Sequence, residues 1–262
     1  MEKLQAALEK ARYSRQDSQK ATRVEDFAKQ ANGSDLWSAI PNFEVPDHVL
    51  QHHRVVTRQA GPNAAPFDIL RTKLLLQMRQ NNWRRLAVTS PTPKSGKTTI
   101  ACNLALGLGR QRDMRSILMD LDLRSPSISD FFETVPPHNI GDVLTRQIGF
   151  EEQALRFGDN VLCAMSSQIE SDPSRILLAE DTVEVLDQIE ATYKPDIVIF
   201  DLPSVLVNDD TRAFLKNVDC ALIVARANTT RYGQFDICER EVNEHTNVLG
   251  TVLNAHPYND KT

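Results

Sequence analysis

The chain has 262 residues, of which 41% are hydrophobic and 25% charged, enough for one globular domain with a full core. Its formal net charge of -5 argues against a protein that coats nucleic acid, and no apolar run approaches the ~20 residues that span a bilayer. Its four cysteines are far apart and lack metal-ligand spacing, so we expect reduced thiols. Taken together, these features predict a soluble, cytoplasmic protein with no nucleic-acid partner.

Residues 1–64 are expected to lie outside the main domain. Apolar residues at helical spacing in the first dozen positions predict a short amphipathic helix. The polar stretch 13–38 indicates a flexible linker, and prolines then punctuate an extended segment. The helix is either a loosely packed tail or a docking element for a partner, and the sequence leaves both open.

Residues 65–262 show the pattern of one α/β domain. Helices are expected at 67–78, 97–108, 141–145, 173–192 and 230–244, and strands at 85–90, 116–121, 160–165, 196–201, 220–225 and 248–254. This alternation favours a mainly parallel central sheet with helices on both faces, and ligands of such sheets bind at the carboxyl ends of the strands.

A phosphate-binding loop is predicted where strand 85–90 meets helix 97–108. The connecting sequence "PTPKSGKTT" ends in the Gly-Lys-Thr of a Walker A motif. Backbone N–H groups of such a loop point at phosphate oxygens, Lys97 adds a charge to the β- and γ-phosphates, and the Thr98 hydroxyl can ligate Mg²⁺. The residues expected to bind the nucleotide, most simply Mg-ATP, are Lys94, Ser95, Gly96, Lys97, Thr98 and Thr99.

Aspartates end two of the predicted strands. Asp120 and Asp122 occupy alternate positions and therefore share a face, and Asp201 ends the strand 196–201. Carboxylates, phosphates and water are the ligands Mg²⁺ prefers, so Thr98 and these three aspartates are the predicted metal site. Asp122 could instead act as the base that receives a hydroxyl proton.

The stretches "PTPKSGKTT", "ILMDLDLRSPS" and "DIVIFDLPSVLVNDD" resemble the bacterial tyrosine kinases (BY-kinases) of capsule and exopolysaccharide assembly, within the MinD/ParA-like branch of P-loop ATPases. The resemblance covers roughly residues 65 to 255. It implies a three-layer P-loop NTPase fold and transfer of the ATP γ-phosphate to tyrosine with Mg²⁺. The catalytic residues it implies are Lys97, Asp120, Asp122 and Arg124, and Asn254 falls where related ATPases often contact adenine.

The resemblance also implies a membrane partner. The N-terminal sequence "LQAALEKAR" is similar to that of exopolysaccharide-linked members without a membrane domain. In such systems a separate transmembrane polysaccharide co-polymerase supplies the activating cytoplasmic segment. We therefore expect the chain at the inner face of the plasma membrane when that partner holds it.

The sequence departs from the family pattern at three places. Pro91 and Lys94 replace small residues of the loop, which predicts weaker nucleotide binding rather than none. The ring-forming motif Glu-x-x-Arg-x-x-Arg aligns with Ala65, Asp68 and Arg71 and keeps only its last position, which leaves a homo-oligomer open. The tail carries one tyrosine, Tyr258, instead of a tyrosine cluster.

Two alternatives to a kinase come from other classes. One is a P-loop ATPase switch whose ATP state controls a membrane polysaccharide co-polymerase. The other is a positioning ATPase of the ParA/MinD type, but such proteins carry a signature lysine where this chain has Thr92. The intact Asp-x-Asp-x-Arg sequence favours the kinase.

Overall fold

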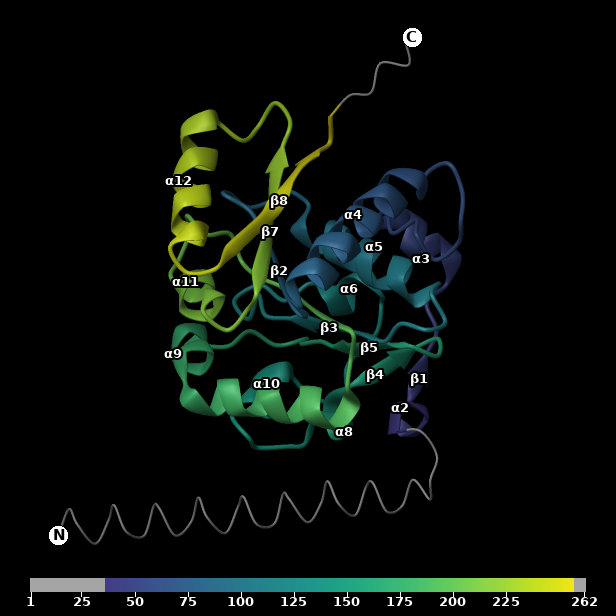
Figure 1. The fold of residues 1–262 in the computed structure, drawn as a ribbon. Coiled ribbons are helices and arrows are strands. Elements are labelled where there is room, and N and C mark those ends of the chain that lie inside the picture. The colour runs from purple at the N-terminus through teal and green to yellow at the C-terminus, as the bar shows by residue number, and fades with distance from the viewer. Residues whose placement is uncertain (1–35, 257–262) are drawn as a thin grey trace, which may run out of the picture. The chain divides into compact units, whose positions relative to one another are not determined.

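The computed structural model describes residues 36–256, and the chain divides into two compact units, residues 1–40 and 41–262. The described part of the first unit contains the short helix α2 (Leu36–Ala39). The predicted N-terminal helix, most of the predicted linker and Tyr258 lie outside the described residues. Figure 1 labels most of the helices and strands of residues 41–256.

An eight-stranded sheet forms the centre of this unit. All neighbouring strands are parallel except β4 and β5, so the predicted mainly parallel sheet is confirmed. Across the sheet the strands lie in the order β1 (Asn42–Phe43), β4 (Leu155–Phe157), β5 (Val161–Ala164), β3 (Ser116–Asp120), β6 (Ile197–Asp201), β2 (Arg85–Thr89), β7 (Cys220–Arg226) and β8 (Asn247–Asn254).

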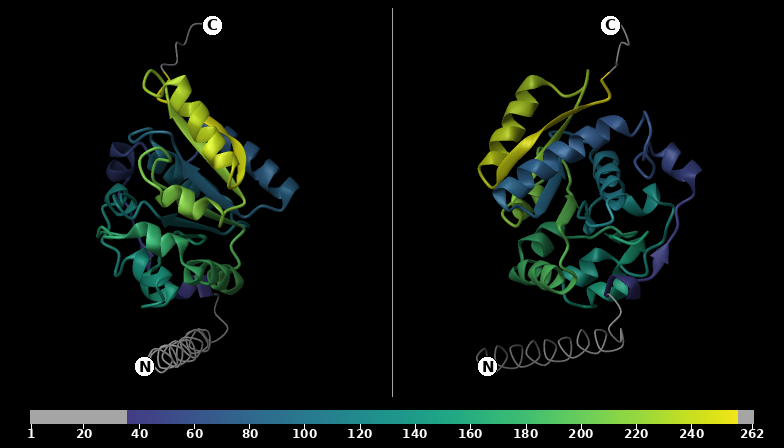
Figure 2. Two further views of the ribbon diagram at one scale, coloured as in Figure 1. Left: turned by 90° about the vertical axis from the view of Figure 1, so that its left-hand side faces the viewer. Right: turned by 45° about the vertical axis from the view of Figure 1, so that its right-hand side comes forward.

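Helices cover both faces of the sheet (Figures 1 and 2). On one face, Leu86 and Val88 of β2 share a hydrophobic core with α4 (Ala65–Asn81) and α5 (Lys97–Gly109). On the other face, the ring of Phe200 lies 4.9 Å from that of Phe214 in α11 (Asp210–Leu215), between centroids. The remaining helices are α3 (Asp47–His52), α6 (Ile128–Phe131), α7 (Ile140–Leu144), α8 (Phe150–Gln153), α9 (Pro173–Leu178), α10 (Glu180–Tyr193) and α12 (Tyr232–Asn243).

Helix α5 is a rigid support for the loop that precedes it. Its residues from Ile100 to Leu108 are all buried, including the polar Asn103. A helix that is apolar nearly all round is typical of a protein interior. The Asn103 amide binds the backbone of the segment before α4, accepting from the N–H of Val56 at 2.8 Å and donating to the carbonyl of Arg54 at 2.9 Å.

The segment 41–64 belongs to the compact unit, although the sequence analysis assigned it to the N-terminal linker region. Phe43 of β1 pairs with Phe157 of β4, and Val49 and Leu50 of α3 lie in the hydrophobic core. The frequent prolines suggested an extended, unpacked segment, but the apolar residues between them outweigh that signal. The folded unit therefore begins near Pro41 rather than at residue 65.

Other elements also differ from expectation, and two of them matter for the sheet and the helices around it. The single helix expected over 173–192 is two helices, because Ala179 is extended (φ -64°, ψ 143°) and its N–H closes α9 on the carbonyl of Ile176. Strand β4 was not expected, and its antiparallel pairing with β5 uses a turn in which Gly158 has φ +63°. Within the described residues, no helix has the length and apolar character needed to cross a membrane.

Candidate nucleotide-binding site

The predicted loop runs from the carboxyl end of β2 to the first residue of α5, and its side chains form hydrogen bonds with its own backbone. Gly96 has φ +93° and Lys94 has φ +61°, so both residues are in the left-handed region. The hydroxyl groups of Ser90 and Ser95 both donate to the carbonyl of Thr92, at 2.8 and 2.7 Å. These bonds give the loop a defined path despite its loss of glycines.

Lys97 is the first residue of α5, and its side chain reaches the segment that follows β6. The residue is only 9% exposed, and its Nζ lies 3.5 Å from the Ser204 hydroxyl. Ser204 in turn lies 3.0 Å from the hydroxyl of Ser90. Within residues 36–256 the ammonium makes hydrogen-bond contact with this one neutral hydroxyl and with no carboxylate, which leaves its charge available to an anion.

Thr98 and Asp201, both expected in the metal site, are in direct contact. The Thr98 hydroxyl donates to Asp201 Oδ2 at 2.6 Å and lies 3.2 Å from the hydroxyl of Ser127. Asp201 is fully buried at the end of β6, and its Oδ1 has no hydrogen-bond partner in the described part of the chain. Burial raises the pKa of Asp201 to about 6, against the opposing effects of Lys97 and Thr98.

Asp120 lies beside Asp201 in the sheet, since β3 and β6 pair with these residues in register. Its Oδ2 accepts the N–H groups of Ser127 and Ile128, at 2.8 and 2.9 Å, and therefore holds the start of α6. Burial, and then the charge of Asp201, raise the pKa of Asp120 well above its usual range. Asp120 thus already has a structural role in organising this edge of the site.

Asp122 and Arg124 follow β3 in the next loop. Burial raises the pKa of Asp122, although the charge of Lys97 opposes this effect. The guanidinium of Arg124 makes a bidentate pair with the buried Asp210, at 2.6 and 3.0 Å. Asp210 also accepts from the Ser174 hydroxyl at 2.5 Å. Arg124, expected near the transferring group, is therefore held by the first residue of α11.

Asn254 ends β8 and lies against the loop rather than apart from it. Its Nδ2 donates to the carbonyl of Ser95 at 2.9 Å. Arg226, at the end of β7, donates from its guanidinium to the carbonyl of Lys94 at 3.0 Å. Contact of Asn254 with adenine stays a prediction.

Among the residues that contact the predicted ones but were not expected in the site are Ser127, Ser204, Asp210 and Arg226. Ser204 and Asp210 lie in the same stretch as Asp201, "DIVIFDLPSVLVNDD", so polar residues following the acidic strand end were an available signal. Arg226 offered no such signal, because its role depends on where β7 ends relative to the loop.

The donors present fit a nucleotide with its magnesium ion. The Thr98 hydroxyl and the unpartnered buried Asp201 Oδ1 are oxygen ligands of the kind Mg²⁺ takes. Within residues 36–256, no three His, Cys, Asp or Glu side chains form a group that could hold a metal ion. Mg²⁺ in nucleotide sites is commonly bound by one or two carboxylates together with phosphates and water.

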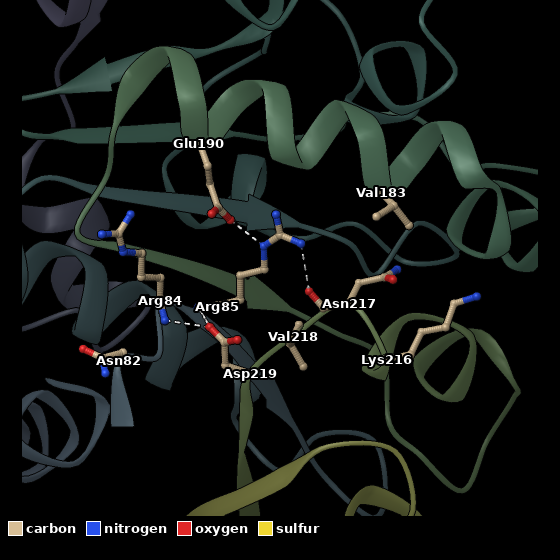
Figure 3. Close-up of a pocket in the computed structure, with 9 residues that line it drawn as sticks. All are labelled: Asn82, Arg84, Arg85, Val183, Glu190, Lys216, Asn217, Val218 and Asp219. Atoms are coloured by element: carbon tan, nitrogen blue, oxygen red, sulfur yellow. Dashed lines mark hydrogen bonds and ion pairs between the residues drawn. The ribbon is translucent and has the colours of Figure 1, made fainter. Parts of the chain in front are cut away.

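Pockets also lie at the amino ends of the strands, opposite the phosphate-binding loop, but the charged Arg85 side chain that lines one of them is already paired. One of about 390 Å³, drawn in Figure 3, lies at the amino ends of β2 and β7. Its Arg85 is bound by Glu190 at 2.5 Å and by the carbonyl of Asn217 at 3.3 Å. Since that cation is already paired, and parallel sheets bind ligands at their carboxyl ends, we assign the site to the loop after β2.

The remaining arginine of the ring-forming motif is used within the chain. Arg71 donates to the carbonyl of Gly107 at 2.7 Å and pairs with Asp68 at 2.9 Å. Asp68 also binds Arg110, so these side chains fasten α4 to α5. The motif position that the sequence keeps therefore has an intramolecular role that needs no second copy.

Gly96→Ala should disable the loop. A Cβ on Gly96 would lie 2.1 Å from Asn254 Nδ2, and the left-handed backbone costs a non-glycine residue about 1–2 kcal/mol. We expect nucleotide affinity, measured by calorimetric titration, to fall at least about tenfold. Gly233→Ala is the matched control, because a Cβ there meets nothing within 4 Å in α12, and equal nucleotide affinity in both variants would contradict the prediction.

No protein-family model matches the chain. It is 26% identical over 188 residues to the tyrosine-protein kinase etk of Escherichia coli (strain K12), which covers 71% of this chain and 26% of that protein. It is 24% identical over 202 residues to the tyrosine-protein kinase YwqD of Bacillus subtilis (strain 168), covering 76% and 84%. The chain thus spans about a quarter of the length of the first relative.

Solved structures show the same fold. The kinase domain of E. coli ETK superposes with a TM-score of 0.70 at 24% identity, over 77% of this chain and 79% of that one. The cell division ATPase MinD of Pyrococcus furiosus superposes with a TM-score of 0.56 at 22% identity, over 68% and 74%. Fold and loop together define a P-loop NTPase domain. Within that class, the relatives named tyrosine-protein kinases confirm the resemblance to the bacterial tyrosine kinases.

Proposed function

We propose that the chain is an ATP-dependent protein-tyrosine kinase of exopolysaccharide or capsule assembly. The observation that carries this proposal is the convergence of Lys97, Thr98 and Asp201 at the carboxyl edge of the sheet, in a chain similar to named tyrosine kinases. A phosphate group placed over the loop would meet the Lys97 ammonium and the N–H groups at the start of α5.

Each residue then has a role that its surroundings support. Lys97 would bind the β- and γ-phosphates of ATP, and Thr98 with Asp201 would hold the magnesium ion. When bound, Mg²⁺ offsets the negative charge that develops on the phosphates. Asp120 would orient this edge through its bonds to Ser127 and Ile128 rather than act directly.

The phosphoryl transfer needs a group to receive the tyrosine proton. The phenolic oxygen attacks the γ-phosphorus, the bond to the β–γ bridging oxygen breaks, and ADP leaves. Asp122 would accept the proton, and its partial burial raises its pKa and so strengthens it as a base. Arg124 would stabilise the transferring group only after exchanging one of its bonds to Asp210 for the phosphate.

Partner and location are part of the same proposal. We place the chain in the cytoplasm, bound to the cytoplasmic segment of a membrane polysaccharide co-polymerase. That segment would bring the kinase to its substrates at the inner face of the membrane.

The test is incubation of the purified chain with γ-labelled ATP, Mg²⁺ and a tyrosine-containing protein or peptide. Label on tyrosine that depends on Lys97 supports the kinase. Phosphate release without labelled tyrosine would contradict it and favour the ATPase switch. The assay is run with and without the cytoplasmic segment of the co-polymerase, because an inactive chain that this segment activates would still be a kinase.

A further inference from the structure

Four carbonyl groups of the phosphate-binding loop accept hydrogen bonds, three of them from distant segments of the chain. The carbonyl of Thr92 accepts two hydroxyl groups, and the carbonyl of Pro91 accepts the N–H of Leu206 at 3.4 Å. The carbonyls of Lys94 and Ser95 accept from Arg226 and Asn254. The last two bonds come from strands β7 and β8, far from the loop in sequence.

Backbone hydrogen bonds between β7 and β8 hold Arg226 and Asn254 beside each other, independently of their contacts with the loop. They lie opposite each other in the β7–β8 register, and the N–H of Ala227 donates to the carbonyl of Asn254 at 2.9 Å. The Asn254 Oδ1 accepts the N–H of Ala255 at 2.8 Å, which leaves its Nδ2 facing the loop. The Arg226 N–H donates to the Thr230 hydroxyl at 2.8 Å, so the backbone that carries the guanidinium is also held.

The orientation of a carbonyl determines that of the following N–H, because a trans peptide is planar and the two groups point in opposite directions. The bond from Arg226 to the Lys94 carbonyl therefore turns the Ser95 N–H away from Arg226. The bond from Asn254 to the Ser95 carbonyl likewise turns the Gly96 N–H away from Asn254. Neither of these N–H groups has a hydrogen-bond acceptor in the described part of the chain.

We propose that Arg226 and Asn254 are positioning residues that hold the peptides 94–95 and 95–96 with their N–H groups directed at the bound phosphate. We attribute the need for these two hydrogen bonds to the backbone conformation of Lys94. It is left-handed at φ +61°, a conformation that glycine adopts without cost and lysine does not. The hydrogen bond from a charged guanidinium to its carbonyl offsets that strain.

This inference rests on the proposed nucleotide binding and is tested by titrating Mg-ADP into the full chain by calorimetry. Arg226→Ala should weaken binding by about tenfold, the size expected for a lost charge-assisted hydrogen bond. In the Lys94→Gly background the same change should have a much smaller effect, because glycine adopts the loop conformation unaided. Arg231→Ala, which removes the same charge from an exposed position, is the control and should bind as the wild type does.

Measuring nucleotide binding at low and high ionic strength distinguishes positioning of the loop by Arg226 from direct attraction between its charge and the phosphate. If Arg226 acts through the Lys94 carbonyl, the loss in Arg226→Ala persists at high ionic strength, where an interaction of its charge with phosphate would be screened. Equal binding by Arg226→Ala and wild type, an undiminished effect in the Lys94→Gly background, or loss of the effect in high salt would each overturn the inference alone. Wild-type protein that binds no nucleotide would overturn both the inference and the proposed function.

Discussion

Lys97→Met should lower tyrosine phosphorylation at least about a hundredfold, the scale on which preorganised electrostatic donors act. Lys97 has a buried ammonium in contact with the neutral Ser204 hydroxyl, so its charge is available to phosphates. Methionine has a similar length and helix propensity, so α5 and its core should remain intact. The measurement is initial rate with γ-labelled ATP, alongside calorimetric titration of the nucleotide.

Lys73→Met is the matched control for Lys97→Met. Lys73 is exposed on α4, and its loss makes the same change in net charge without touching the loop. Circular dichroism of both variants checks that the fold is retained. A Lys97→Met protein that labels tyrosine at the wild-type rate would show that this lysine does not serve the phosphates.

Asp201→Asn should stabilise the nucleotide-free protein while abolishing magnesium-dependent binding. Burial raises the pKa of Asp201 from the usual 3.8 to about 6, so the folded state disfavours the ionised carboxylate at neutral pH. Asparagine has no charge to bury and can still accept from Thr98. We expect the free energy of unfolding to rise by on the order of 2 kcal/mol at neutral pH.

The pH dependence has a definite sign. The pKa is raised on folding, so the stability that Asp201 contributes is fully present below about pH 4 and is lost as pH rises through about 6. The advantage of Asp201→Asn should therefore grow between those values in urea unfolding. Asp113→Asn, at an exposed aspartate, should change neither stability nor binding. A less stable Asp201→Asn protein would contradict this account.

The main elements of the site were predictable because local sequence determines them. Strand β2, the loop and α5 are contiguous, and Asp120 and Asp201 each end a buried strand. The parallel sheet then brings Thr98 and Asp201 together, since β2 and β6 are neighbours. The loop residues and the aspartates at the strand ends could therefore be predicted from contiguous motifs in the sequence.

The rest depends on contacts between distant segments. Nothing near Arg124 in sequence indicates that Asp210 binds its guanidinium. Nothing near Lys94 indicates that Arg226 binds its carbonyl. The segment 41–64 was placed outside the domain because its prolines outweighed its apolar residues, whereas in the fold Phe43 and Val49 pack with the core.

The bond between Asn254 and Ser95 joins residues 159 positions apart in the chain. On the ribosome, the loop, its strand and α5 are made long before β8 emerges. At roughly 5–20 residues per second, the delay is on the order of ten to thirty seconds. A nascent chain therefore carries its Walker A motif for that time without the strand that orients it. The phosphate-binding loop reaches its final conformation only when β8 has been synthesised and has paired with β7.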